Sequence, residues 1–169
     1  MADEVVGRRS ALKLGGMAAI GAVGAGAVAL APQGASAAGP LTYNTITPFR
    51  SVSTPSFGLP KLRSGESDDW DLWTDVNGNA QLPSTIQAVT YNLTITKTEG
   101  AAFLAIIPAG TPFTGISTIN WNTRNADIAN GGTVGLGFSG VTGAGSCTII
   151  CGGVGAATHY LIDVTGYYT

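Results

Sequence analysis

Charge is scarce in this sequence. Only 11% of its 169 residues are charged, and its 8 lysines and arginines are outnumbered by 10 aspartates and glutamates. Three of these bases, Arg8, Arg9 and Lys13, lie near the start, so the rest of the chain is more acidic than the whole. Nucleic-acid binders need a clustered basic surface that displaces counterions from phosphate. We therefore expect no nucleic-acid partner.

The residues that usually build catalytic and metal sites are also few. The chain has one histidine, His159, and two cysteines, and a tetrahedral structural zinc site needs four nitrogen or sulfur ligands. His159 and Asp163 are four residues apart on an expected strand, too far for a shared hydrogen bond of about 3 Å. No Gly-x-Ser-x-Gly elbow is present. We expect no cofactor and no enzymatic activity, with a small secreted hydrolase as the alternative.

Cys147 and Cys151 are four residues apart. In an extended strand this spacing separates the α-carbons by about 13 Å, whereas a disulfide requires about 7 Å or less. A bridge would require the chain to turn back through Gly152 and Gly153. We favour two free thiols that act as small apolar side chains.

Helical periodicity is missing after residue 37. Short apolar runs instead alternate with Gly, Pro, Asn and Asp, and 25 residues are glycine. About eight or nine strands at this spacing predict an all-β fold, a single antiparallel β-sandwich that is jelly-roll-like. The clearest expected strands are Leu41 to Ile46, Phe49 to Ser53, Ile86 to Thr96, Ala102 to Ile107, Ser117 to Trp121, Thr133 to Phe138, Ser146 to Ile150 and residues 156 to 168.

The last of these strands, residues 156 to 168, has the most informative pattern. Tyr160, Ile162 and Val164 alternate with His159, Leu161 and Asp163, so apolar side chains occur on both faces. This pattern is typical of a central strand covered on both sides.

Two turns are expected from local signals. Ile86 to Thr96 and Ala102 to Ile107 are predicted to form a hairpin through the turn at Glu99 and Gly100. The Asn-Gly pair within Asp75 to Asn79 indicates a second tight turn, after the acidic run from Glu66.

The first 37 residues have the features of a helical signal segment. Arg8 and Arg9 are followed by Leu12, Lys13 and an apolar run that ends near Ala31, and Ala35-Ser36-Ala37 is a small-x-small processing site. The segment resembles a twin-arginine export signal, although Ala11 stands where a phenylalanine is usual. The resemblance implies recognition of Arg8 and Arg9 by the twin-arginine export machinery and cleavage between Ala37 and Ala38. A permanent membrane anchor is the alternative, but we expect no lasting membrane span.

Residues 38 to 169 are predicted to form the β-sandwich domain. Within them, a series of short motifs resembles, in order, a β-rich domain of exported proteins from high-GC Gram-positive bacteria. That domain occurs alone, repeated or appended to hydrolases, and the resemblance implies a secreted accessory or surface domain without an established activity. Where it usually has Arg-Leu-Leu-Asp-Thr-Arg, this chain has Arg50-Ser51-Val52-Ser53-Thr54-Pro55, which lacks the acid and the second arginine. The motifs are Ile46 to Arg50, Ala88 to Thr94, Pro108 to Pro112, Ser117 to Trp121 and Thr158 to Tyr167.

Asp163 stands in an otherwise apolar strand. A buried carboxylate must be paired or neutralised, and only five bases follow the predicted leader. We predict an internal ion pair between Arg50 and Asp163 that links the first and last strands. The alternative is that Asp163 accepts hydrogen bonds from backbone or hydroxyl groups.

The tryptophans provide the case for carbohydrate binding, because flat aromatic faces stack on pyranose rings. Trp70 and Trp73 have opposite parity on a strand, which makes Trp73 the outward candidate. With Asp71, Asp75 and Trp121 it forms the predicted ligand-binding set. A core role for all three tryptophans is the alternative. The acidic run could also supply oxygen ligands to calcium, but its favoured interpretation is a solvated strand edge and turn.

Taken together, these patterns predict a secreted, non-enzymatic domain at the cell surface or outside the cell. Its role is expected to be structural or weakly carbohydrate-binding, with cell-envelope polysaccharide as the partner. A self-assembling surface protein is a further alternative, because a β-rich chain with few charges has edges that can pair with copies of itself.

Overall fold

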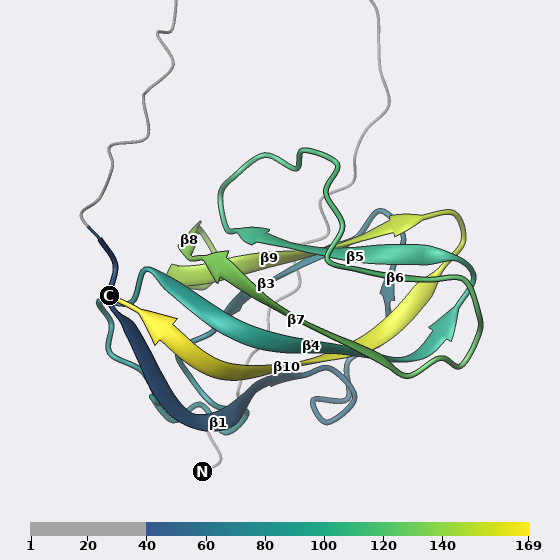
Figure 1. Ribbon diagram of the computed structural model, residues 1–169. Helices are drawn as coiled ribbons and strands as arrows, with labels where there is room; N and C mark the ends of the chain where they lie inside the picture. The colour runs from purple at the N-terminus through teal and green to yellow at the C-terminus, as the bar shows by residue number, and fades with distance from the viewer. Residues whose placement is uncertain (1–39) are drawn as a thin grey trace, which may run out of the picture.

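The computed structural model describes residues 40–169, which form two antiparallel five-stranded sheets packed face to face as an open sandwich (Figure 1). The predicted all-β sandwich is confirmed. The predicted leader, with Arg8, Arg9, Ala37 and Ala38, lies outside the described residues. Within residues 40–169, no helix has the length and apolar character needed to cross a membrane.

The ten strands divide equally between two sheets, and the chain passes from one sheet to the other several times. Sheet A has the order β1-β10-β4-β7, with β2 also paired to β10, and sheet B has the order β3-β9-β5-β6, with β8 also paired to β9. Sheet A contains β1 (Tyr43–Ser53), β2 (Leu62–Arg63), β4 (Ala88–Glu99), β7 (Ile128–Gly135) and β10 (Ala157–Tyr168). Sheet B contains β3 (Ser67–Asp71), β5 (Ala102–Pro108), β6 (Ile119–Trp121), β8 (Gly137–Ser139) and β9 (Gly143–Gly153).

β10 lies in the middle of sheet A, between β1 and β4, as its sequence predicts. Its inner face is fully buried, because Tyr160, Ile162 and Val164 have no exposed surface. The expectation that both faces are covered was wrong, since Leu161 and Asp163 on the outer face are only half-buried. The strands that pair with β10 lie beside it in sheet A. On the outer face of this sheet, no other layer of residues 40–169 packs over β10.

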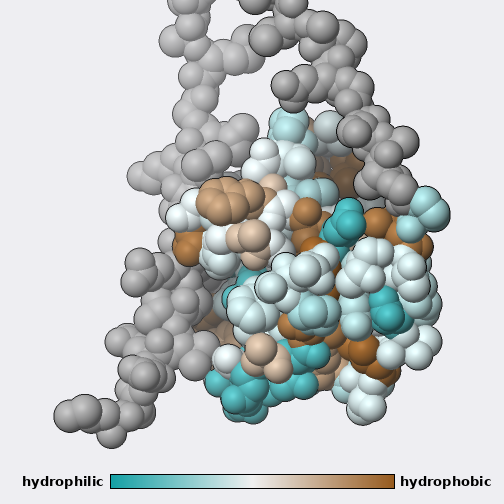
Figure 2. Space-filling view, turned by 90° about the vertical axis from the view of Figure 1, so that its left-hand side faces the viewer, coloured by the Kyte–Doolittle hydropathy of each residue, from teal (hydrophilic) through white to brown (hydrophobic). Residues whose placement is uncertain are grey.

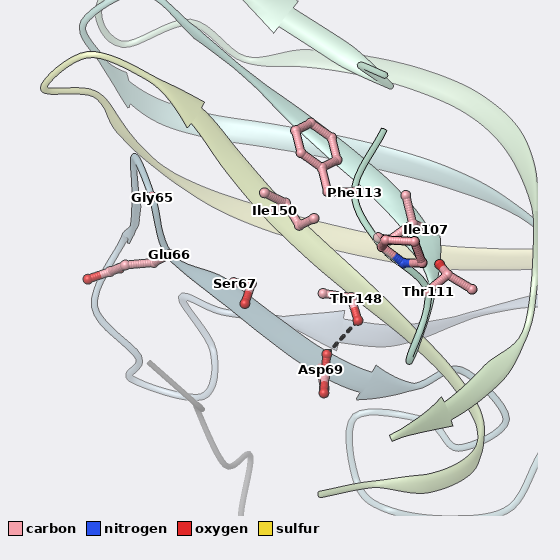
Figure 3. Close-up of a pocket in the computed structure, with 10 residues that line it drawn as sticks. Gly65, Glu66, Ser67, Asp69, Ile107, Thr111, Phe113, Thr148 and Ile150 are labelled. Carbon is pink, nitrogen blue, oxygen red and sulfur yellow. Dashed lines mark hydrogen bonds between the residues drawn. The ribbon is translucent and has the colours of Figure 1, made fainter. Parts of the chain in front are cut away.

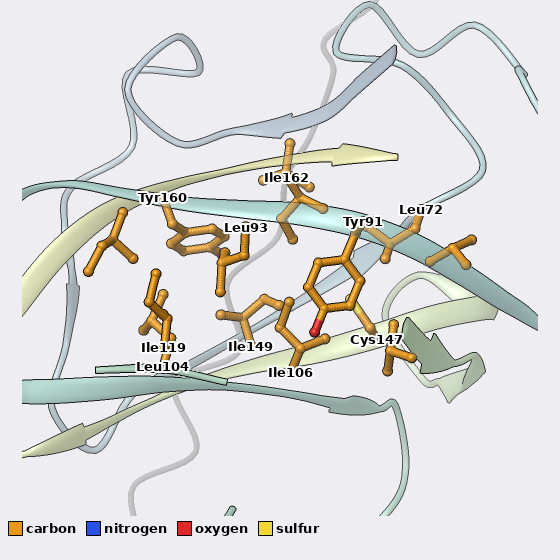
Figure 4. Close-up of a cluster of buried hydrophobic side chains, with 14 of the residues drawn as sticks. Leu72, Tyr91, Leu93, Leu104, Ile106, Ile119, Cys147, Ile149, Tyr160 and Ile162 are labelled. Carbon is orange, nitrogen blue, oxygen red and sulfur yellow. The ribbon is translucent and has the colours of Figure 1, made fainter. Parts of the chain in front are cut away.

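The core fills the space between the two sheets (Figure 4). Alternation decides which side chains enter it: Leu93 of β4 and Ile162 of β10 point inward from sheet A, and Leu104 of β5 and Ile149 of β9 point inward from sheet B. Each of these four side chains is fully buried. Their burial holds the sheets together and leaves the opposite parity on every strand facing outward.

The predicted hairpin between residues 86 to 96 and 102 to 107 does not form, because β4 and β5 belong to different sheets. The turn itself is present but carries the chain from one layer to the other. Gly100 has a φ of 68°, and a Cβ there would lie 3.1 Å from that of Ala156, so this corner favours glycine. Local alternation predicted both strands correctly but contained no information about the strands with which each of them pairs.

The start of the chain also differs in detail. The two short strands expected on either side of Pro48 form one strand, β1, whose register against β10 shifts between Thr45 and Phe49. Such an irregularity on an edge strand accommodates proline without loss of a ladder hydrogen bond. The Asp75 to Asn79 turn is confirmed: the amide of Gly78, at a φ of 80°, donates to the Asp75 carbonyl over 2.9 Å.

Candidate functional site

The outer face of sheet B contains a pocket of about 490 Å³, which we call the sheet B pocket (Figure 3). Two strands, β3 and β9, form one side, and β5 with the loop that follows it forms the other. Its lining residues are Gly65, Glu66, Ser67, Asp69, Ile107, Thr111, Pro112, Phe113, Thr148 and Ile150.

Strand parity explains why these residues face outward. On β9, Cys147, Ile149 and Cys151 are buried in the core, so Thr148 and Ile150 project from the opposite face. The register then places Thr148 beside Ile107 of β5 and beside Asp69 of β3. Residues separated by up to about 80 positions in the chain therefore become neighbours on one face.

The loop after β5 forms the wall of the pocket. Phe113 stacks on Phe103 of β5 with ring centroids 6.2 Å apart and an angle of 21° between the rings, and it remains 42% exposed. Gly110 begins this loop with a φ of 78°, and a Cβ there would lie only 2.7 Å from the Phe138 carbonyl oxygen. The loop can therefore approach β8 only because residue 110 has no side chain.

The polar side of the pocket is acidic. Asp69 accepts a hydrogen bond from the Thr148 hydroxyl and another from the Ser139 hydroxyl, both over 2.6 Å. A second carboxylate, Glu66, accepts from the backbone amide of Arg63 over 2.9 Å. No lysine or arginine side chain is among the lining residues. These contacts fix Asp69 in position and give the pocket a negative character beside its isoleucines.

The structure does not bring the predicted ligand-binding residues together in this pocket. Trp121 is only 4% exposed, and its indole nitrogen points to the Glu99 carbonyl oxygen, 3.4 Å away, so it cannot stack on a sugar. Trp73 is partly buried and packs against the core cluster. The inward parity of β6, which also buries Ile119, is the physical reason that Trp121 belongs to the core.

The two predicted aspartates stabilise local structure instead. Asp71 accepts a hydrogen bond from the Thr74 hydroxyl. Asp75 accepts from the amides of Asn77 and Asn79 within its own turn, and these bonds, led by the one from the Asn79 amide, lower the pKa of Asp75. Among the described residues, no group of three His, Cys, Asp or Glu side chains is placed to hold a metal ion.

The predicted pair of Arg50 and Asp163 is present. Arg50 Nε lies 2.7 Å from Asp163 Oδ1 and Nη2 lies 2.9 Å from Oδ2, so the contact is bidentate, and the two residues are direct partners in the β1–β10 register. The side chains are 46% and 25% exposed. The pair therefore joins the first and last strands on the outer surface of sheet A, not in the interior as predicted.

A polar network that the sequence analysis missed crosses the interior. The Trp70 indole nitrogen donates to Tyr160 Oη over 2.6 Å, and Tyr160 Oη donates to Asp68 Oδ2 over 2.7 Å. Asp68 is only 1% exposed. Burial, followed by the nearby Asp68 carboxylate, raises the pKa of Tyr160 well above 10. The signal was available, because Asp68 shares the inward parity of Trp70 and Leu72.

The prediction of two free thiols is confirmed, and both Cys147 and Cys151 are buried. They lie on the inner face of β9, where the strand continues through both positions. Burial raises the pKa of the Cys147 thiol far above its ordinary value and that of Cys151 to about 12. Neither group has the exposed, lowered-pKa environment of a reactive cysteine.

Apolar side chains also reach the surface elsewhere. Phe138 is 67% exposed and Val154 is 93% exposed. Figure 2 shows one side of the molecule, on which brown apolar groups are interspersed with white and teal polar ones. Single exposed apolar residues of this kind are normal on protein surfaces, so the sheet B pocket remains the stronger candidate.

Comparison of the chain with family models, with curated proteins and with solved structures finds no match. The resemblance to an exported β-rich domain therefore stays a prediction.

Proposed function

We propose that this protein is a non-enzymatic domain, exported by the twin-arginine route, that binds a neutral glycan at or outside the cell envelope through its sheet B pocket. The observation that carries this proposal is the pocket itself, which combines an apolar floor, an exposed aromatic ring and fixed oxygen groups. Ligand sites usually have this composition, a mostly apolar lining with a few positioned polar groups.

The chemistry of the lining selects the ligand class. Ile150 and the half-exposed ring of Phe113 offer surfaces for the C–H faces of a pyranose, above the buried side chain of Ile107. Ser67 and Thr111 offer hydroxyl groups, and the nearby carboxylates accept hydrogen bonds from sugar hydroxyls. Because the lining contains two carboxylates and no lysine or arginine, it repels anionic polymers and favours neutral ones.

Phe113 gives the sharpest test, because it lies on an exposed loop and its truncation is tolerated by the core. We expect Phe113→Ala to reduce retention on an insoluble neutral glucan or on chitin by about tenfold, the effect of losing about 1.4 kcal/mol of stacking. Retention is measured by pull-down, and affinity for soluble fragments by calorimetric titration.

The matched control is Phe138→Ala, which removes another exposed phenylalanine that does not line the pocket. It should bind as the unmodified chain does. Equal loss in both variants, or stronger retention on an anionic polysaccharide than on the neutral ones, would contradict the proposed site.

A further inference from the structure

The edge strands of the two sheets differ greatly in the features that prevent pairing with another chain. An edge strand exposes unpaired amide and carbonyl groups, and proteins prevent pairing with other chains by short edges, charges, proline or bulges. β1 has Pro48, Arg50 and a shifted register. β3 has three aspartates in five residues. The strands β2, β6 and β8 are two or three residues long.

β7 has none of these protections. Its eight residues, Ile-Ala-Asn-Gly-Gly-Thr-Val-Gly, include no charged residue and no proline, and its pairing with β4 runs from Ile128 to Gly135 without a register shift. Six of the eight residues are exposed. Among the described residues, β7 has β4 as its one partner in the sheet, and Figure 1 shows it running along the front of sheet A.

We propose that β7 is an interaction edge at which a second copy of this chain adds its own β7 in antiparallel orientation, joining two copies of sheet A into one continuous sheet. This inference concerns sheet A and is independent of the sheet B pocket. Main-chain hydrogen bonds would supply the affinity, as in other cases of strand addition, and the two-fold arrangement makes the contact self-complementary.

The sequence of β7 fits its own copy in a specific register. If the two-fold axis passes through Gly131, Ile128 lies opposite Val134 of the second copy and Ala129 lies opposite Thr133, so paired side chains share a face. Ile128 is 37% exposed in the single chain although it faces the same side as buried Ile95. The pairing covers it with an apolar residue, which is the reason for choosing this register.

Charge does not oppose this contact. Asp127, the residue before β7, would lie opposite Gly135, so no like charges meet directly. The centre of the contact is formed by Gly131 on both copies, where backbones can approach without side-chain interference. A partner of different sequence would not need a strand that is complementary to itself. Recovery of the dimer by mixing oppositely charged variants distinguishes a second copy from such a partner.

Gly131 also provides a clean variant. A Cβ at this position would lie 3.6 Å from the Tyr91 carbonyl oxygen, an ordinary contact, and the residue has no left-handed φ, so a side chain is compatible with the single-chain fold. We expect Gly131→Lys to place two lysines opposite each other and weaken dimerisation by about tenfold or more. The measurement is sedimentation velocity of the full chain over a wide range of concentrations.

Charge reversal makes the test specific. Gly131→Glu alone should weaken dimerisation to a similar extent, whereas an equimolar mixture of Gly131→Lys and Gly131→Glu should recover the dimer, because opposite charges then face each other. Thr45→Lys, on the exposed part of the β1 edge, is the matched control and should dimerise as the unmodified chain does. A monomeric unmodified chain, undiminished association of Gly131→Lys, or a mixture without recovery would overturn the proposal.

Discussion

Two carboxylates in this molecule receive hydrogen bonds from side chains of other strands, yet their surroundings differ completely. Asp68 is 1% exposed and accepts from Tyr160 between the two sheets. Asp163, with a side chain 25% exposed, accepts from Arg50 on the outside of sheet A. The interior contact is between a carboxylate and a neutral hydroxyl, whereas the surface contact is a full ion pair.

The difference shows that burial, more than formal charge, decides what a polar contact contributes. A buried polar group that loses its partner pays the full cost of desolvation, about 1–3 kcal/mol and more for a charged group. In a solvent-exposed ion pair, both charged groups stay solvated whether or not the pair forms. Such a pair therefore contributes only about 0.2–1 kcal/mol to the free energy of unfolding. The comparison can be tested by perturbing the two regions separately.

The largest effect is expected from Tyr160→Phe. This change leaves the ring in the core but removes the hydroxyl that bonds to both Asp68 and Trp70. We expect the free energy of unfolding to fall by about 3 kcal/mol, measured by urea denaturation. Tyr167→Phe on the same strand is the control and should change it by less than about 0.5 kcal/mol. Equal losses would show that the interior network does not stabilise the fold.

A smaller effect is expected from the buried thiols at alkaline pH. Unfolded cysteines lose their protons near pH 9 or slightly below, whereas burial raises the pKa of Cys151 to about 12 and that of Cys147 further. The unfolded chain therefore binds fewer protons above about pH 9, and stability falls as the pH rises. We expect a loss of about 2 kcal/mol between about pH 8 and about pH 9.5 under reducing conditions.

The double variant Cys147→Ala with Cys151→Ala provides the control for this pH dependence. It should be less stable at every pH, because it creates space in the core. Its stability should nevertheless change little over the same interval, since the two thiols are gone. A slope as steep as that of the unmodified chain would assign the alkaline loss to other groups.

The smallest effect is expected at the surface pair. Asp163→Asn should lower the free energy of unfolding by less than about 1 kcal/mol, and a double-mutant cycle with Arg50→Gln should give a coupling of about 0.5 kcal/mol that decreases with salt. The measurement is urea denaturation at low and high ionic strength. A coupling larger than the loss in Tyr160→Phe would reverse the ranking of the two regions.

The sequence predicted the features that depend on neighbouring residues. The alternation around Tyr160, Ile162 and Val164 identified a central strand, and the Asn-Gly pair after Asp75 identified a turn. The separation of Cys147 and Cys151 along an extended strand indicated free thiols. The pair of Arg50 and Asp163 was predicted because few bases were available, although its exposure was not.

Features that depend on sheet assignment were out of reach. The sheet B pocket combines Asp69, Ile107 and Thr148, which no local pattern connects, and the β4–β5 turn gave no sign that it changes layers. A partial signal existed on β9, because Ile150 is an apolar residue of outward parity beside buried Ile149. A strand with apolar residues on both faces is either covered twice or offers one face to a ligand.

The position of β10 has a consequence for how the molecule folds. β1 and β2 each pair with β10 alone, and the contact of Arg50 with Asp163 closes 113 residues of chain. During synthesis these two strands must wait without neighbours until residues 157 to 168 have left the ribosome. Sheets built on such distant pairings fold on a timescale of about milliseconds to seconds, so the nascent domain passes through an interval in which β1 and β2 lack the twelve-residue strand with which they pair.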